Sequence, residues 1–71
     1  MFYQGDKLIA IDEYEMPDGK KLLTPGKEYQ IDELHYQDLS FSVTGDHDGE
    51  IVIGFEEAKK IFDLENIIPA E

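Results

Sequence analysis

A regular alternation of apolar and polar residues on both sides of a glycine-rich turn is the feature that most constrains the fold of this chain. The alternation runs through residues 39–44 and again through residues 50–55, with the turn at residues 45–49 between them. Side chains of a β-strand point alternately to opposite faces, so each run predicts a half-buried strand and the turn predicts an antiparallel hairpin. The expected inward positions are Leu39, Phe41, Val43, Ile51, Ile53 and Phe55.

A short apolar strand and a long loop are expected at the start of the chain. Residues 7–11 are apolar at odd and even positions alike, which is typical of a strand covered on two sides. Residues 12–26 are mainly polar and hold two turn signals, Pro17-Asp18-Gly19 and Thr24-Pro25-Gly26. Gly26 after Pro25 suits a type II turn, which needs a positive φ angle. We therefore expect a long loop with a chain reversal inside it.

The strand that follows this loop changes its inward parity. Tyr29 and Ile31 share one face, whereas Leu34 and Tyr36 take the opposite parity. The change indicates a bulge or bend near residues 32–33, which would let one strand turn the corner of a barrel. The Tyr29 hydroxyl is expected to reach the rim of that barrel.

After the hairpin the period changes again. Apolar residues spaced i, i+3 and i+4 predict one or two helical turns over residues 56–62. The apolar residues at 64, 67 and 68 then predict a short edge strand that Pro69 ends. Five short strands, a long first loop and a late helical turn predict a mainly β fold, a small five-stranded SH3-like barrel that forms one domain over residues 1–71.

Two stretches of the chain carry a motif as well as a period. They read Gly5-Asp6-Lys7-Leu8-Ile9-Ala10-Ile11-Asp12 and Leu23-Thr24-Pro25-Gly26-Lys27-Glu28-Tyr29-Gln30-Ile31. Together with the turn at residues 48–50 and the apolar residues 61–62, they resemble the small SH3-like barrel domains that are common in phage and prophage accessory proteins. The resemblance spans most of residues 5–62. It implies an SH3-like fold and a phage- or prophage-type accessory protein.

Size and cysteine usage limit how the fold is stabilised. Seventy-one residues build one core, and the absence of cysteine excludes a disulfide framework and a thiolate zinc site. Apolar packing is therefore the expected source of stability, and a reducing compartment fits this composition. The chain has no apolar run of membrane-spanning length, and its first residues lack the basic and apolar regions of a signal peptide. We expect a soluble, cytoplasmic protein without a membrane partner.

The charge of the chain limits the classes of partner that it can bind. Seventeen acidic residues against six lysines, with no arginine, give a net charge of −11. Nucleic-acid affinity comes largely from phosphate neutralisation, so direct binding of DNA or RNA is not expected. The same charge would attract a protein partner with a basic surface, and it would also keep a small protein soluble.

The sequence carries no motif that predicts catalysis or a cofactor. Asp46, Asp48 and Glu50 are spaced like the start of a calcium-binding loop, but the later glutamate and the flanking helices are missing, so a hairpin turn is favoured and no metal site is predicted. His35 and His47 belong to no catalytic motif and are expected to be solvated. We therefore expect no enzymatic activity, no catalytic residues and no cofactor.

The first loop is a candidate binding element. Acidic side chains there flank Tyr14, much as acidic and aromatic residues line the first loop of peptide-binding SH3 domains. The chain has no tryptophan and no Ala-Leu-Tyr-Asp-Tyr run, so an aromatic groove for proline-rich peptides would be incomplete. The acidic positions of this loop are Glu13, Glu15 and Asp18.

The strand at residues 28–32 is a second candidate. Glu28 and Asp32 share a face with Gln30, at roughly 6 to 7 Å per two residues, which is close to the spacing of phosphates along DNA. This geometry permits DNA mimicry, although a solvated face of an acidic protein is the simpler interpretation.

These features predict a non-enzymatic protein-interaction module that binds a basic partner through an acidic face, in a sharper version as a DNA-mimic inhibitor of a nucleic-acid-binding enzyme. The alternative is a structural or assembly domain of a phage protein that self-associates through its strand edges; the oligomeric state stays open. Tyr36 is expected to serve as an aromatic anchor if it is exposed. The predicted binding residues are Glu13, Tyr14, Glu15, Asp18, Glu28, Asp32, Glu33 and Tyr36.

Overall fold

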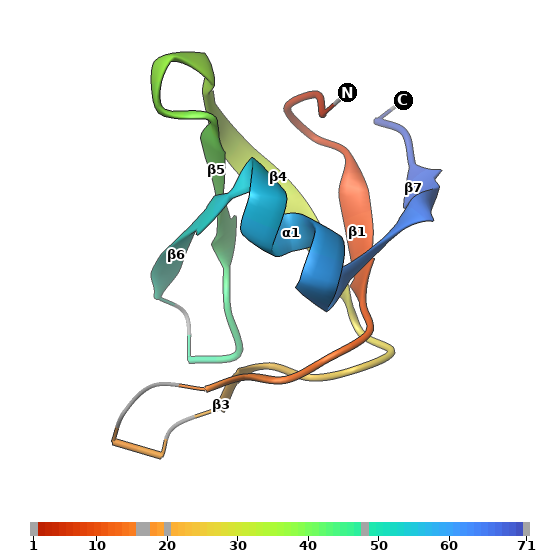
Figure 1. Ribbon diagram of the computed structural model, residues 1–71. Helices are drawn as coiled ribbons and strands as arrows, with labels where there is room; N and C mark the ends of the chain where they lie inside the picture. The colour runs from red at the N-terminus through yellow and green to blue at the C-terminus, as the bar shows by residue number, and fades with distance from the viewer. Residues whose placement is uncertain (1, 16–17, 20, 48, 71) are drawn as a thin grey trace.

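The fold is a five-stranded antiparallel sheet with a small two-stranded sheet at one end and a short helix against it (Figure 1). A computed structural model describes residues 2–15, 18–19, 21–47 and 49–70. The large sheet has the order β6-β5-β4-β1-β7 and consists of β1 (Lys7–Ala10), β4 (Glu28–His35), β5 (Ser40–Thr44), β6 (Glu50–Gly54) and β7 (Phe62–Ile68). The remaining elements are β2 (Tyr14–Glu15), β3 (Lys21–Leu23), the 3-10 helix η1 (Tyr36–Asp38) and the helix α1 (Phe55–Ile61).

The mainly β fold is confirmed, whereas the closed barrel is not found. Within the described residues β6 and β7 are the two outer strands, and they pair only with β5 and β1. The expected antiparallel hairpin is confirmed, because β5 and β6 pair without a register shift from Ser40 and Gly54 to Thr44 and Glu50. The sheet therefore has two edges.

One apolar core lies between the sheet and α1. Its largest fully buried side chains come from β1, β3, β4, β5, β6 and the start of β7: Phe41, Phe62, Leu8, Leu23, Ile31, Ile53 and Val43. Phe2 joins this core, with its ring centroid 4.9 Å from that of Phe41 and 5.0 Å from that of Phe55. Burial of these side chains is the main stabilising contribution that the chain can make, since it has no disulfide.

The helix and the last strand follow the sequence pattern closely. α1 begins at Phe55, one residue before the predicted start, and its inward residues Ala58 and Ile61 are buried. Glu56 forms an exposed ion pair at 3.0 Å with Lys59. β7 pairs antiparallel with β1 as an edge strand and ends at Ile68, directly before the proline, as predicted.

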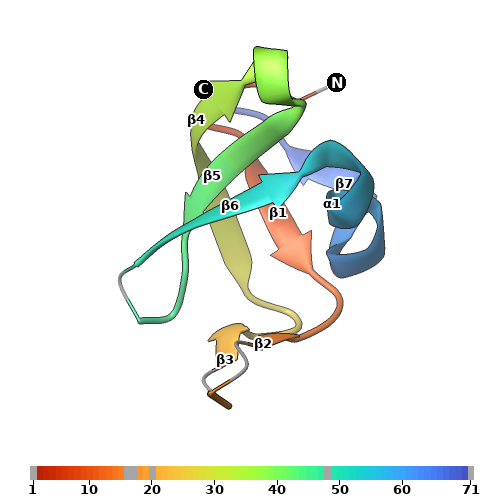
Figure 2. The same cartoon turned by 60° about the vertical axis from the view of Figure 1, so that its left-hand side comes forward.

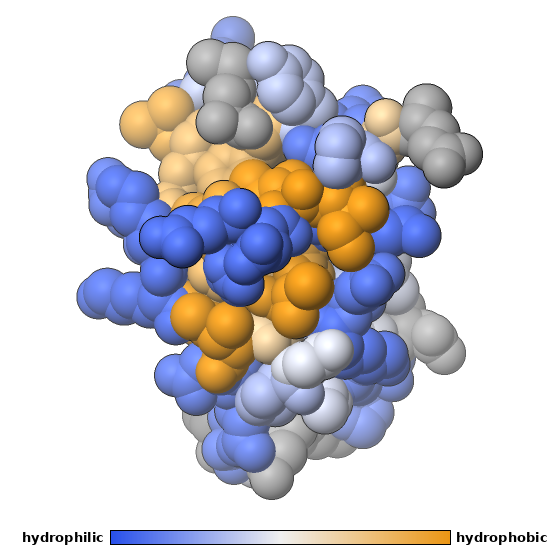
Figure 3. Space-filling view, turned by 90° about the vertical axis from the view of Figure 1, so that its right-hand side faces the viewer, coloured by the Kyte–Doolittle hydropathy of each residue, from blue (hydrophilic) through white to orange (hydrophobic). Residues whose placement is uncertain are grey.

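β1 differs from the prediction of a strand covered on both sides. Leu8 and Ala10 are buried, but Ile9 is only half-buried, and Ile11, directly after the strand, is 55% exposed. Figure 3 shows apolar side chains gathered on the face that carries β1 and β7, with hydrophilic side chains across them. The sheet has an apolar layer on one side of β1, and its other side stays open among the described residues.

The predicted irregularity near residues 32–33 is confirmed as a β-bulge. Ile31 of β4 pairs with Val43 of β5, but Glu33 pairs with Ser42, so β4 has one residue more than its partner at this point. A bulge of this kind bends and twists the strand. It explains why Leu34, of the opposite parity, still packs against the core.

Three positions of the alternating hairpin depart from the predicted pattern. Leu39 was expected to point inward, yet it is 63% exposed and has a φ angle of 51°. It ends η1 and its carbonyl accepts the Phe55 N–H at 2.8 Å, so β5 begins only at the next residue. Ser40 and Ser42, which alternate with the inward positions of β5, are buried as well.

The long first loop contains the expected reversal as the β2–β3 hairpin. Met16, Pro17 and Lys20 lie outside the described residues, so the predicted Pro-Asp-Gly turn is described only at its Asp18 and Gly19. The second turn is of type II as predicted: the Lys27 N–H donates to the Thr24 carbonyl at 3.1 Å, and Gly26 has a φ angle of 87°.

The two ends of the described chain meet at the buried carboxylate of Asp6. One of its oxygens accepts the Tyr3 N–H and the other accepts the Ala70 N–H, each at 3.2 Å. Both ends therefore lie at the same end of the molecule (Figure 1).

Candidate protein-interaction surface

The outer face of β4 carries the predicted row of carboxylates. Tyr29 and Ile31 point into the core, so Glu28 and Asp32, which alternate with them, point outward and are exposed. The bulge adds the exposed Glu33 to the same face. Glu33 pairs with Ser42, and the neighbours of Ser42 in β5 point to the core, so Ser42 and Glu33 both point outward. Three predicted binding residues are thus brought together.

A fourth carboxylate joins this row from β6. The Thr44 hydroxyl donates to Asp32 at 2.8 Å, and Thr44 pairs across β5 and β6 with Glu50. Residues directly opposite in neighbouring strands have their Cβ atoms about 5 Å apart. We call Glu28, Asp32, Glu33 and Glu50 the acidic sheet face; Lys7, which pairs with Gln30, borders it on the β1 side.

The middle of this face is formed by small side chains of β5. Ser42 lies between Glu33 and Val52 in the strand pairing and is fully buried. Its hydroxyl oxygen has no hydrogen-bond partner within the described chain. His35, half-buried, lies next along β4, with its Nε2 4.0 Å from the Glu33 carboxylate.

The first-loop residues lie elsewhere, on and around the β2–β3 hairpin. Glu13, Glu15 and Asp18 are exposed, while Tyr14 is half-buried and packs against the core. Tyr14 and Asp18 line a groove of about 460 Å³ between this hairpin and β6. We call it the β6 groove.

Tyr36 lies directly after the end of β4 and belongs to neither group. It belongs to η1, at the end of the molecule opposite the β2–β3 hairpin in Figures 1 and 2. It is 52% exposed, its ring meets that of Phe55 edge-on at 6.5 Å, and its hydroxyl donates to the Phe2 carbonyl at 3.1 Å. The eight predicted residues therefore fall into three regions and do not form one site.

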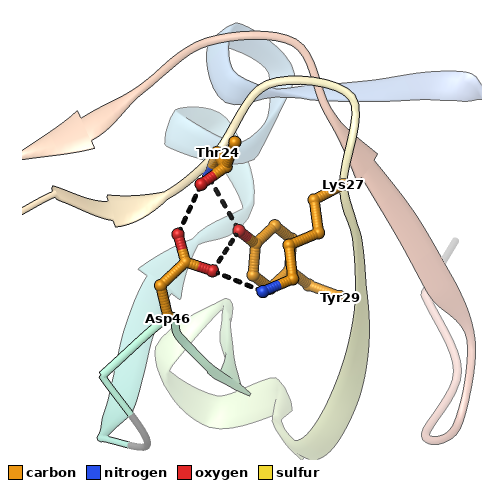
Figure 4. Close-up of polar contacts among 4 residues, drawn as sticks. All are labelled: Thr24, Lys27, Tyr29 and Asp46. Carbon is orange, nitrogen blue, oxygen red and sulfur yellow. Dashed lines mark hydrogen bonds and ion pairs between the residues drawn. The ribbon is translucent and has the colours of Figure 1, made fainter.

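A polar network fixes the β2–β3 hairpin relative to the β5–β6 turn (Figure 4). The Asp46 carboxylate accepts hydrogen bonds from the Thr24 hydroxyl at 2.6 Å, the Tyr29 hydroxyl at 2.8 Å and the Lys27 ammonium at 2.9 Å. The Tyr29 hydroxyl in turn accepts the Thr24 N–H at 2.7 Å. The Asp46 N–H donates to the Leu22 carbonyl at 2.8 Å, which adds a backbone link.

This network shifts the titration of its two acidic members. The hydrogen bonds from Lys27, Thr24 and Tyr29 lower the pKa of Asp46 from 3.8 to about 2. Burial is the main cause that raises the pKa of Tyr29 above its ordinary value of 10. Tyr29 thus keeps its proton and Asp46 its charge over the whole neutral range, and both stay matched as donor and acceptor.

Asp46 does not support a calcium-binding loop, because its carboxylate already accepts hydrogen bonds from three donors of the protein. Asp48 lies outside the described residues. Among the residues that the structure describes, no three histidine or acidic side chains are grouped to hold a metal ion. Nor does the described chain contain a helix with the length and apolarity needed to cross a bilayer.

Two parts of this surface escaped the sequence interpretation. Glu50 was placed at the start of the predicted strand but was not named as a binding residue, although the alternation indicated an outward side chain. The pairing of Asp46 with Tyr29 joins residues 17 positions apart, and no local pattern predicts such a contact.

Comparison with protein-family models, with curated proteins and with solved structures finds no match to this chain. The functional argument therefore depends on the surface alone.

Proposed function

We propose that this protein is a non-enzymatic interaction module that binds the basic surface of a partner protein through the acidic sheet face. The observation that carries the proposal is the clustering of Asp32, Glu33 and Glu50 around Thr44 on three adjacent strands. Like charges gathered on one face repel one another, and a partner cation would relieve that repulsion. Complementary charge of this kind favours fast and selective association.

We further propose an SH3-like topology and a phage- or prophage-type accessory role, as the sequence resemblance implies. The strand order, the hairpin inserted between β1 and β4, and the helix between β6 and β7 support the interpretation of an SH3-like topology, here with an open sheet. The absence of cysteine supports a reducing compartment such as the cytoplasm.

Affinity capture with two matched triple variants tests the proposal. The face variant combines Glu28→Gln, Asp32→Asn and Glu33→Gln; the control combines Asp38→Asn, Glu57→Gln and Glu65→Gln, three exposed carboxylates on other elements. Both remove three negative charges. We expect the wild type and the control to retain a basic protein at roughly 50 mM salt and the face variant to lose it. Equal capture by both variants would show that net charge, and not this face, attracts the partner.

DNA mimicry is the sharper version of this proposal. The outward spacing of Glu28 and Asp32 supports it, but exposed carboxylates also lie on β2, η1, α1 and β7. It predicts that duplex DNA competes with the captured partner. Capture that is insensitive to excess DNA removes this version and leaves the basic-surface proposal intact.

Assembly through strand edges is the second candidate, because the sheet ends in two outer strands. It predicts concentration-dependent self-association in sedimentation velocity. A single species at the monomer mass across the accessible concentrations counts against it.

A further inference from the structure

The backbone of β6 offers free hydrogen-bonding groups along one side. At the two ends of the β5–β6 ladder, the Gly45 N–H donates to the Gly49 carbonyl at 3.0 Å and the Phe55 N–H donates to the Leu39 carbonyl at 2.8 Å. Hydrogen-bonded pairs recur every second residue in an antiparallel ladder, so Ile51 and Ile53 also bond to β5. The residues that alternate with them, Glu50 and Val52, direct N–H and C=O away from β5, and within the described chain these groups have no partner. The Gly54 N–H also points away from β5, whereas its carbonyl belongs to the N-cap of α1.

The β6 groove runs along this free side. It is lined by His47 and Gly49 of the β5–β6 turn and by three consecutive residues of β6, Glu50, Ile51 and Val52. Successive side chains of a strand point to opposite faces, so a groove that contacts all three follows the backbone edge and not one face. Tyr14 and Leu22 of the β2–β3 hairpin form the opposite wall. Figure 2 shows β6 on the near side of the sheet with this hairpin below it.

The opposite wall is held in place before any partner arrives. The Leu22 carbonyl accepts the Asp46 N–H, and the Asp46 carboxylate binds Thr24 directly after β3. A wall fixed by these bonds needs little ordering when a ligand binds, which favours affinity.

The lining of the groove defines the chemistry of an occupant. Val52 is 56% exposed and Leu22 and Tyr14 are half-buried, so apolar side chains find contact there. Asp18 and Glu50 add two carboxylates at the same groove. A second copy of the chain is disfavoured by the net charge of −11.

We propose that the free edge of β6 binds an extended peptide segment as an added strand, with a lysine or arginine side chain of that segment between Asp18 and Glu50. Strand addition supplies main-chain hydrogen bonds, and the groove supplies side-chain selection. For the charge of the partner this inference rests on the proposed function; for its extended conformation it does not.

A backbone-modified peptide tests the strand addition directly. The probe is an acetylated and amidated peptide of about seven residues in which valine alternates with lysine. Two further forms are N-methylated, one on every valine and one on every lysine, so that one form loses the donors that face β6. We expect at least one form to bind about tenfold or more weakly in calorimetry, since each lost hydrogen bond contributes about 1 kcal/mol. If both N-methylated forms bind with the affinity of the unmethylated peptide, the proposal is overturned.

A protein variant provides the reciprocal test. Val52→Pro removes an N–H that faces the free edge and is not used by β5, so the fold is expected to remain, as for prolines on other edge strands. Val52→Thr is the matched control, with its N–H retained. We expect a loss of about tenfold or more in peptide affinity for the proline variant and less than about twofold for the threonine variant. If the proline variant unfolds, the N-methylated peptides still test strand addition on the wild-type protein.

Charge variants separate this inference from the proposed function. Asp18→Asn, at a groove carboxylate outside the acidic sheet face, should weaken peptide binding and reduce its dependence on salt, whereas the triple face variant on β4 should leave it nearly unchanged. Peptide affinity lost in the β4 triple variant but kept in Val52→Pro would overturn strand addition while preserving the acidic sheet face. A β6-paired dimer in sedimentation velocity, abolished by Val52→Pro, would also overturn it.

Discussion

The outer strands β6 and β7 border the same sheet but are built differently. β6 pairs with β5 at five consecutive positions without a register shift. In β7, Asp63 pairs with Ile9 and Ile68 pairs with Lys7, so residues 64–67 stand opposite Leu8 alone. The Asp63 carboxylate holds this irregular segment by accepting the Glu65 N–H at 3.2 Å and the Asn66 side-chain amide at 2.8 Å.

The difference identifies which edge can accept another strand. Bulges, charged side chains and a following proline are the means by which proteins block edge pairing, and β7 has all three. β6 has a regular backbone and an exposed Val52 at its centre. One edge of the sheet is thus blocked in three ways, and the opposite edge at β6 is left regular.

Gly45→Ala is expected to have the largest effect on stability. It disturbs the packing beside β6 and leaves β7 unchanged. A Cβ at this position would lie 2.8 Å from the Leu22 carbonyl oxygen and would collide with the Ile51 side chain. Overpacking of this kind costs about 3 kcal/mol of unfolding free energy, measured by urea denaturation. Gly49→Ala is the control, since its Cβ would meet no atom within 4 Å. Similar losses for both variants would contradict the close approach of β3 to the turn.

The carboxylates that serve the two edges should differ in stability and in pH dependence. Asp46→Asn weakens three hydrogen bonds and is expected to cost about 2 kcal/mol, while Asp63→Asn, in the β7 bulge, should cost less than about 1 kcal/mol. Because the folded-state pKa of Asp46 is lowered to about 2, its contribution is complete above pH 4 and is lost as the pH falls from 4 towards 2. Urea denaturation between pH 2 and 7 checks this; an Asp46→Asn variant with the same acid-dependent loss as the wild type would contradict it.

Amide hydrogen exchange should distinguish the free side of β6 from its paired side. We expect Glu50, Val52 and Gly54 to exchange about tenfold or more faster than Ile51 and Ile53, whose N–H groups bond to β5. Two-dimensional NMR during exchange into deuterium oxide provides the rates. Uniform protection along β6 would mean that its edge is already covered.

Ser42→Ala should have the smallest effect. The serine hydroxyl is buried and has no hydrogen-bond partner among the described residues, so its removal leaves no described group unpaired. We expect a change within about 0.5 kcal/mol, or a slight gain in stability. A loss above 1 kcal/mol in urea denaturation would reveal a hydrogen bond to a group outside the described residues.

Much of the fold follows from local patterns in the sequence. Period two located β4, β5 and β6, the parity change at Leu34 predicted the bulge, and the i, i+3, i+4 spacing predicted α1. β2 and β3, with two and three residues, are too short to show a period, so only their reversal was expected. Leu39 was placed inward because its period is correct, but the left-handed turn that ends η1 overrides it.

The candidate site was predictable only in part. The outward row at Glu28 and Asp32 follows from alternation within one strand. The addition of Glu50, the separation of Tyr36 from the β2–β3 hairpin and the free side of β6 all depend on which strands pair. Strand pairing joins residues that are distant in the sequence, and alternation within a single strand does not specify which strands become neighbours.

The meeting of the chain ends at Asp6 determines how the molecule would respond to tension. β1 and β7 are antiparallel, and Lys7 and Ile68 pair at the end where the carboxylate joins Tyr3 and Ala70. A force applied between residues 2 and 70 would therefore open the β1–β7 ladder from that end, one pair after another, instead of shearing all its hydrogen bonds together. The hydrogen bonds of the Asp6 carboxylate would be among the first to break under such a force.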